Sequence, residues 1–168
     1  MTCLQTPRLR LAPYGPGDID GLHSIMKDAR VMAHVGNGAM SRTEVVELVA
    51  RVEKRWQDIG MGWWAIRSRN DDEVLGYMCL QPSRELPEIE VGYGFAPASW
   101  GKGLAKEALR EVLRYASEDR GLHSVVATVR PENLHSIGLL VRSDFVLETT
   151  LHKRNKALCI YRRALVPD

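Results

Sequence analysis

Apolar and polar residues follow two different periods along this chain. Between residues 88 and 95 every odd-numbered position is apolar and every even-numbered position is Glu or Gly, a period of two that is typical of a strand with two different faces. Between residues 104 and 116 apolar residues recur at helical spacing, which predicts a long amphipathic helix that ends near Gly121. Ser41 and Glu44 have the spacing of a capping box, which predicts a second long helix that ends near Gly60.

The same patterns predict the remaining elements. Strands are expected at 8–13, 62–67, 74–80, 88–95, 124–129, 145–151 and 158–163, and helices at 18–26, 41–60, 104–121 and 133–142. Asn70–Asp72 is expected to turn the second strand into the third as a hairpin, residues 34–40 to form a flexible loop, and residues 152–156 a polar turn. Because the order mixes hairpins with helical crossovers, the sheet should be mixed rather than all parallel.

Composition limits the class of protein. The chain has 168 residues, of which 45% are hydrophobic and 26% charged, so we expect one globular domain over 1–168 with its core at about 6–165. A net charge of +2 does not indicate a nucleic-acid partner. Three cysteines without a CxxC pair, no apolar run of membrane length and no signal-peptide pattern favour a cytoplasmic protein without a membrane partner. The histidines have no metal-ligand spacing, so no metal site is predicted.

The segment after the strand at 88–95 carries the candidate chemistry. It reads Gly101-Lys102-Gly103-Leu104-Ala105 and opens the helix at 104. Glycines let backbone come close to a ligand, and the first amides of a helix are unpaired and lie at the positive end of its dipole. The combination predicts a phosphate or pyrophosphate site, unless the glycines only permit a tight turn. The P-loop order is absent, and Lys106 stands where a dinucleotide fingerprint needs its third Gly.

This segment resembles a known family. Trp100-Gly101-Lys102-Gly103-Leu104-Ala105 is similar to the acyl-CoA pyrophosphate loop of the GNAT superfamily of N-acyltransferases, which reads Gln/Arg-x-x-Gly-x-Gly/Ala. The run 99–108 most resembles the branch that contains the ribosomal-protein N-terminal acetyltransferases, and the segments 6–11, 90–93, 133–137 and 144–148 resemble further segments of that branch in the same order. The chain departs from the family pattern at Trp100, Leu140 and Asp144.

The resemblance implies a fold and a cosubstrate. The expected fold is a single-domain α/β (α+β) fold with a mixed, mostly antiparallel sheet of about seven strands, splayed between strands 4 and 5 and flanked by about four helices. A substrate amine would attack the thioester of acetyl-CoA directly, without a covalent enzyme intermediate. Pantetheine would lie along the backbone of Tyr93, Gly94 and Phe95, and the pyrophosphate on the amides of Gly101, Lys102, Gly103, Leu104 and Ala105.

The resemblance also implies a proton donor for the leaving thiolate. Many members of the superfamily use a Tyr on the helix after the fifth strand, but the corresponding residue here is Leu140. Ser136 is the alternative candidate, and a helix cap or a helix-surface hydroxyl is an equally good interpretation of it. Asn133 is expected to contact the cosubstrate or its thioester region, or else to cap the helix.

A base for the incoming ammonium is the second implied role. Glu90 shares a strand face with Gly92 and Gly94 and occupies the Glu position of the branch. Three interpretations stay open: it deprotonates the amine, it holds a cationic acceptor, or it is a solvated strand carboxylate. An α-amine with a pKa of about 8 is roughly a quarter neutral near pH 7.5, whereas a Lys amine is about a thousandth neutral, so an N-terminal amine tolerates a poorly placed base.

Two aromatic residues and one His are candidates for the acceptor wall. Trp63 and Trp64 are adjacent on a strand and must face opposite sides of the sheet, so one is expected in the core and the other, Trp63 in our assignment, in the acceptor pocket. His34 lies in the loop where this branch builds its acceptor wall, although a simple polar loop residue is the commoner case.

These features predict an acetyl-CoA-dependent N-acetyltransferase acting on a protein N-terminus or a related amine, without a metal, as a monomer or homodimer. One alternative keeps the cosubstrate but takes a small-molecule amine such as an aminoglycoside, a polyamine or an amino-acid-like compound; Glu85, Glu88 and Glu90 weakly favour a cationic acceptor of this kind. The other alternative is a non-catalytic module that senses acetyl-CoA, supported only by the missing Tyr.

Overall fold

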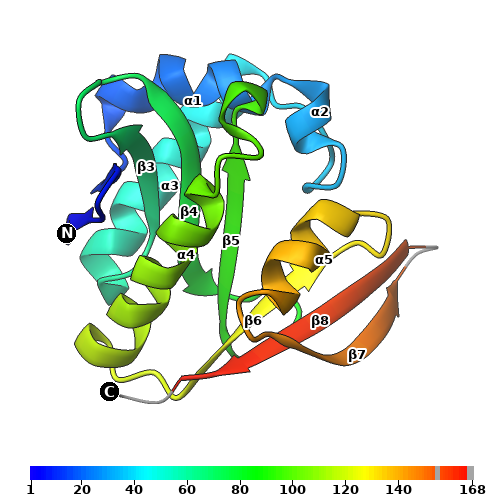
Figure 1. The fold of residues 1–168 in the computed structure, drawn as a ribbon. Coiled ribbons are helices and arrows are strands. Elements are labelled where there is room, and N and C mark those ends of the chain that lie inside the picture. The colour runs from blue at the N-terminus through cyan, green and yellow to red at the C-terminus, as the bar shows by residue number, and fades with distance from the viewer. Residues whose placement is uncertain (154–155, 166–168) are drawn as a thin grey trace.

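A single twisted sheet organises the fold. The computed structural model describes residues 1–153 and 156–165, and within them eight strands follow the order β1-β2-β3-β4-β5-β6-β8-β7 (Figure 1). The strands are β1 (Leu4–Gln5), β2 (Leu9–Pro13), β3 (Trp63–Ser68), β4 (Val74–Pro82), β5 (Ile89–Phe95), β6 (Ser124–Val129), β7 (Val146–Lys153) and β8 (Lys156–Ala164). Every neighbouring pair is antiparallel except β5 and β6, which are parallel.

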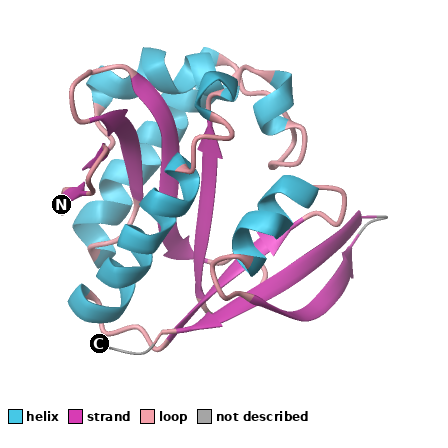
Figure 2. Ribbon diagram, viewed as in Figure 1, coloured by secondary structure: helices cyan, strands magenta, loops and turns pink. Residues whose placement is uncertain are grey.

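Helices cover both faces of the sheet. They are α1 (Ile19–Met26), α2 (Ala29–Met32), α3 (Arg42–Ile59), α4 (Leu104–Arg114) and α5 (Leu134–Val141). Figure 2 shows α4 and α5 in front of the strands and α1 and α3 behind them. The helix α4 contacts β1, β2 and β4, while α5 contacts β6. No helix in the described part of the chain is long and apolar enough to cross a membrane.

The observed fold confirms the predicted mixed α/β sheet with its splay, and the differences are local. The extra strand is β1, which pairs Leu4 with Leu11 and was not expected because it is only two residues long. The helix predicted over 104–121 ends at Arg114 and continues as a π-helical turn over Tyr115–Asp119. The helix α2 lies just before the loop predicted at 34–40. The polar turn predicted at 152–156 includes residues 154–155, which lie outside the described residues.

The sheet opens between β5 and β6. β5 keeps seven register pairs with β4, from Gly76–Phe95 to Pro82–Ile89, but only the pair Glu90–Val126 with β6. In Figure 1 the strands β6, β7 and β8 run diagonally away from the upright β5. The predicted splay between the fourth and fifth strands of the family is therefore the gap between β5 and β6.

Local signals explain why α3 begins and ends where it does. The Ser41 side chain accepts a hydrogen bond from the Glu44 amide at 3.3 Å, and the Glu44 carboxylate accepts one from the Ser41 amide at 2.7 Å. Gly60 ends the helix in the left-handed region with φ of 66° and donates its amide to the Trp56 carbonyl, a conformation that favours glycine. Val45, Val49 and Val52 face the core from this helix.

We expect Ser41→Ala to lower the free energy of unfolding by about 1 kcal/mol, because the cap satisfies an amide that the helix leaves unpaired. Urea unfolding followed by circular dichroism measures the change. Thr43→Ala, in the same exposed first turn, is the matched control and should change stability by less than about 0.5 kcal/mol. Equal losses in both variants would contradict the capping role of Ser41.

Candidate active site

A cleft occupies the opening between β5 and β6. It has a volume of about 660 Å³. Six residues singled out from the sequence line it together: His34, Trp63, Glu90, Tyr93, Asn133 and Ser136. The expected cosubstrate residues Gly94, Phe95, Gly101, Lys102, Gly103, Leu104 and Ala105 are not part of this lining. The cleft therefore gathers the candidate catalytic and acceptor residues, with the glycine loop outside it.

Two hydroxyl groups donate hydrogen bonds to the carboxylate of Glu90. Its Oε2 atom accepts hydrogen bonds from Ser83 Oγ and Thr128 Oγ1, each at 3.0 Å. Burial raises the pKa of the Glu90 carboxyl above its usual value, and the bonds from Ser83 and Thr128 and the charge of Arg84 only partly offset this effect. The sequence did not indicate either hydroxyl partner, since Ser83 lies in a loop and Thr128 on β6.

Ser136 is paired with a tyrosine hydroxyl on β5. Ser136 Oγ lies 2.8 Å from Tyr93 Oη, and either hydroxyl can donate to the other; the Ser136 carbonyl oxygen, a second possible acceptor for the phenol, lies 3.3 Å from Tyr93 Oη. Asn133 caps α5, because its Oδ1 accepts a hydrogen bond from the Ser136 amide at 3.2 Å. Leu140, at the position where the family often has Tyr, is buried. Burial raises the pKa of Tyr93 to about 12, so its phenol is protonated at neutral pH.

Glu90 and Tyr93 approach the opening from opposite faces of the sheet, because side chains alternate along a strand. Gly92 and Gly94 share the face of Glu90, where a Cβ on Gly92 would lie 3.0 Å from Cys79 Sγ and one on Gly94 would lie 2.6 Å from the Tyr77 ring. The two glycines therefore make room for these β4 side chains. A carboxylate thus lies on one face of the opening and a hydroxyl pair on the other.

The backbone N–H and C=O groups of β5 point alternately toward β4 and toward the opening. The Ala96 amide donates to the Leu75 carbonyl, so Ala96 faces β4, and Phe95 and Tyr93 direct their backbone groups the opposite way, since successive residues of a strand alternate. Gly94 faces β4, where it pairs with Tyr77. Of the three residues expected along pantetheine, Tyr93 and Phe95 have backbone groups on the open side and Gly94 does not.

Trp63 lines the cleft and Trp64 lies in the core. The Trp63 ring stacks on Tyr77 with centroids 5.1 Å apart and planes 20° apart. Its Nε1 donates to Gln81 Oε1 at 2.8 Å, and this oxygen also accepts from Arg55 at 2.6 Å. Trp64 is fully buried. The two tryptophans thus face opposite sides of the sheet, one in the core and one at the cleft, and an acceptor-binding role of Trp63 stays a prediction.

The glycine loop has the conformation that an anion site needs. Gly101 and Gly103 have φ of 73° and 75°, in the left-handed region that favours glycine. α4 begins at Leu104, so its first amides have no carbonyl of a preceding helical turn to bond. Trp100, where the family pattern has Gln or Arg, is half exposed, and its Nε1 donates to the Phe95 carbonyl at 2.8 Å.

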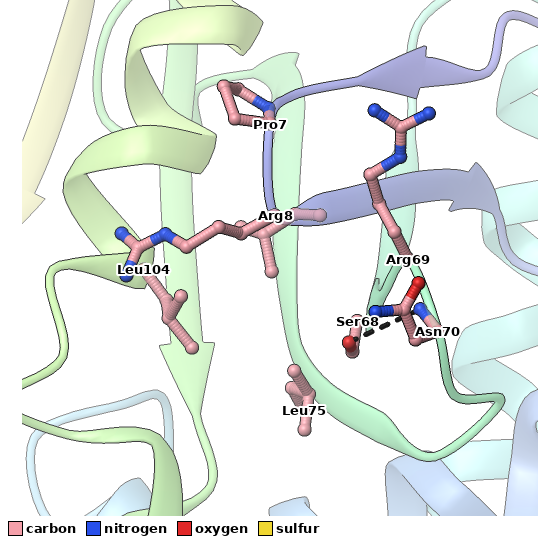
Figure 3. A pocket seen from close by; sticks show the side chains of 8 residues that line it. Pro7, Arg8, Ser68, Arg69, Asn70, Leu75 and Leu104 are labelled. Carbon is pink, nitrogen blue, oxygen red and sulfur yellow. Dashed lines mark hydrogen bonds between the residues drawn. The ribbon is translucent and has the colours of Figure 1, made fainter.

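A hydrogen-bond network that the sequence analysis missed connects this loop and the start of α4 to the segment between β1 and β2. Glu107 on α4 accepts hydrogen bonds from Thr6 Oγ1 at 2.5 Å, from the Arg8 amide at 2.9 Å and from Arg8 Nε at 2.6 Å. Arg8 also donates to the Lys102 carbonyl at 2.9 Å. Figure 3 shows the Arg8 side chain reaching from the β1–β2 turn toward Leu104, across a second cavity of about 530 Å³. Arg8 and Glu107 are 99 residues apart in the sequence, so no local pattern indicated this contact.

Comparison with known proteins decides the family. A family model described as an acetyltransferase (GNAT) domain matches residues 8–146. The chain belongs to the GNAT acetyltransferase family. It is therefore an acetyl-CoA-dependent acetyltransferase, and the non-catalytic sensor considered from the sequence is not supported.

Relatives of this GNAT chain differ in their acceptors. It is 28% identical over 165 residues to the uncharacterized protein YkkB of Bacillus subtilis, covering 96% of this chain and 95% of that protein. The solved structure of RimL, a ribosomal L7/L12 alpha-N-protein acetyltransferase in complex with coenzyme A, has a TM-score of 0.83 at 16% identity over 99% and 100% of the two chains. Spermidine N-acetyltransferase from Vibrio cholerae, solved with CoA and spermine, has a TM-score of 0.79 at 20% identity over 95% and 97%. At these identities the two structures share the fold.

The residues of this GNAT chain fit a CoA thioester. Positive-φ glycines, the free amides at the start of α4 and the open side of β5 are donors of the kind that a pyrophosphate and a peptide-like pantetheine chain need. No atom lies within 4 Å of a Cβ built on Gly101, so space is left beside the loop. Within residues 1–153 and 156–165, no group of three or more His, Cys, Asp or Glu side chains is arranged to hold a metal ion.

We expect Gly103→Val to weaken acetyl-CoA binding at least tenfold, or about 1.4 kcal/mol, because a β-branched side chain is strained at positive φ and displaces the loop amides from the pyrophosphate. Titration calorimetry measures the affinity. The control is Gly121→Val, which imposes the same strain at φ of 63° at the far end of the helix and should leave the affinity unchanged. Equal affinity in a folded Gly103→Val protein would remove the pyrophosphate assignment.

Proposed function

We propose that this enzyme transfers the acetyl group of acetyl-CoA directly to the amine of a protein N-terminus or a related α-amine. Glu90 takes the proton of the incoming ammonium on one face of the sheet, and the Ser136 hydroxyl donates a hydrogen bond to the departing thiolate on the other. The observation that carries the proposal is the cleft between β5 and β6, which both side chains line. Amine and thioester would meet there from opposite faces, which supplies the proximity on which direct transfer depends.

The cosubstrate would lie along the open side of β5 and the glycine loop. The backbone groups of Tyr93 and the amide of Phe95 would bind pantetheine, and the amides from Gly101 to Ala105, with the charge of Lys102, would bind the pyrophosphate. Acetyl-CoA supplies the activated acetyl group. Asn133 would act here by holding the start of α5, and thereby Ser136, beside the opening. These elements would work as one catalytic domain.

Charge in the cleft supports an α-amine over a polycation. Basic side chains in its described lining are Arg51, Arg84, Arg130 and Lys156, and acidic ones are Glu44, Glu85 and Glu90. Spermidine and aminoglycosides carry several positive charges and favour a clearly acidic pocket. Glu88 does not add to such a pocket, because Arg162 holds it through a bond at 2.7 Å and keeps its pKa below the usual value. Of the two named structural neighbours, RimL has the acceptor type that fits this balance.

A panel of acceptors tests the proposal through thiol release from acetyl-CoA. Peptides with a free α-amine and a blocked Lys should react with a kcat/KM at least tenfold above that of spermidine, an aminoglycoside and a peptide with a blocked α-amine and a free Lys. Free amino acids in the same panel show whether the acceptor must be a peptide. A preference for spermidine or the aminoglycoside would overturn the proposed acceptor class while leaving the acetyltransferase activity intact.

The role of Glu90 has a pH signature. Its carboxyl must be ionised to accept a proton, so kcat/KM should fall as the pH drops through a pKa that burial places above the usual Glu value. In Glu90→Gln this acid limb should disappear, leaving a rise that follows ionisation of the acceptor amine. A variant that raises only KM, more strongly at low salt, would show that Glu90 merely attracts a cation.

Thr128→Val supplies a graded version of this test. It removes one of the two hydrogen bonds that lower the pKa of Glu90, so the acid limb should move to higher pH while persisting. Thr149→Val, at an exposed position on β7, is the matched control and should leave the profile in place. An unmoved limb in Thr128→Val would mean that the titrating group is not Glu90.

A further inference from the structure

Tyr93 gives Ser136 a partner that its own helix does not provide. A serine hydroxyl near a helix N-terminus rotates freely and can turn back to bond a carbonyl one turn earlier, which directs its proton away from the cleft. Tyr93 Oη lies within bonding distance of two acceptors on this one residue, Ser136 Oγ at 2.8 Å and the Ser136 carbonyl at 3.3 Å. The hydroxyl oxygen is the nearer acceptor, and the carbonyl is in position to accept the amide of Leu140 within α5.

We infer that Tyr93 is a positioning residue for acetyl transfer: its phenol donates to Ser136 Oγ, so that the Ser136 proton points into the cleft toward the sulfur that leaves. The inference rests on the proposed role of Ser136. Tyr93 itself makes no contact with the reacting atoms in this assignment. Ser136 is then fixed at two atoms, its amide by Asn133 Oδ1 and its Oγ by Tyr93.

The fate of each proton in the reaction defines the role of the Tyr93–Ser136 pair. The C–N bond forms, Glu90 takes the amine proton, the C–S bond breaks and the electron pair stays on sulfur. A thiol with a pKa of about 8.5 is a far stronger acid than an alcohol or a phenol, so the thiolate leaves as an anion and takes its proton from water. The Ser136 hydroxyl stabilises the negative charge on sulfur by a hydrogen bond, and the phenol strengthens that bond by donating to the same oxygen.

Tyr93 supplies a phenol next to α5, although residue 140 of that helix is not a tyrosine. Residue 140 of α5 provides no hydroxyl, because it is a leucine, and its side chain is buried. Tyr93 projects from β5 toward α5 instead, and its ring and Ser136 both line the cleft. Burial raises the pKa of Tyr93 to about 12, so the phenol remains protonated, and able to donate, at neutral pH.

Tyr93→Phe removes only the hydroxyl and tests the inference. We expect kcat to fall about tenfold, with acetyl-CoA affinity and acceptor KM within about twofold of the parent. Ser136→Ala should give a similar or larger fall, and the double variant should be no slower than Ser136→Ala, since the phenol acts through that oxygen. Tyr115→Phe is the control: it also loses a hydroxyl bonded to a backbone carbonyl, that of Gly60 at 3.0 Å, and should keep kcat.

The possible outcomes distinguish a failure of the positioning role of Tyr93 from a failure of the proposed role of Ser136. Losses of Tyr93→Phe and Ser136→Ala that multiply in the double variant would overturn the positioning role while leaving Ser136 as the donor. A normal kcat in Ser136→Ala would overturn both the donor role of Ser136 and the inference, while the Glu90 profile and the acceptor panel would still report on transfer to an amine. A matching loss in Tyr115→Phe would make the effect of Tyr93→Phe one of stability alone.

Discussion

The separation of β5 from β6 beyond Glu90 is the constraint on which the site depends. β5 is paired along its whole length with β4 but keeps one register pair with β6. Backbone groups of Tyr93 and Phe95 therefore face an opening instead of a neighbouring strand. Unpaired backbone groups away from water are costly, so an opening of this kind favours a ligand that carries amides of its own. In the proposed mode of binding, the backbone of β5 therefore contributes to recognition of pantetheine before any side chain does.

The alternation of side chains along β5 then places the proposed catalytic groups on two different faces of the sheet. Even-numbered residues of β5 face one layer and odd-numbered residues the other, so Glu90 and Tyr93 cannot share a face. The hydroxyls of Ser83 and Thr128 both donate to one carboxylate oxygen of Glu90, and in the proposed mechanism the other oxygen takes the proton of the amine. A one-residue shift of β5 would exchange both sets of side chains and abolish the arrangement. The register of β5 with β4 therefore maintains the arrangement of the proposed site as well as the fold.

Sequence reasoning reached the parts of this protein that depend on local patterns. The capping box of α3, the alternation of β5 and the glycine loop are encoded within a few neighbouring residues, and the structure bears out those elements. The Tyr93–Ser136 pair spans 43 residues and the Arg8–Glu107 pair 99. Such contacts exist only once the sheet order and the opening place α5 beside β5 and α4 beside the first strands. No periodicity in the sequence contains that information, so the partners of Ser136 and Glu90 were missed.

Trp100, which departs from the family pattern, binds a backbone group that the separation of β5 from β6 leaves without a strand partner. Because the Ala96 amide donates to β4, the planar trans peptide directs the Phe95 carbonyl away from β4, toward the open side. The Trp100 indole binds this carbonyl at 2.8 Å, so it satisfies one of the groups that the missing strand pairing leaves free. The same bond joins the end of β5 to the residue directly before the glycine loop. An opening whose end is already ordered loses less entropy when a ligand binds, and a flexible Gln or Arg at this position offers less of that order than an indole with two rotatable bonds.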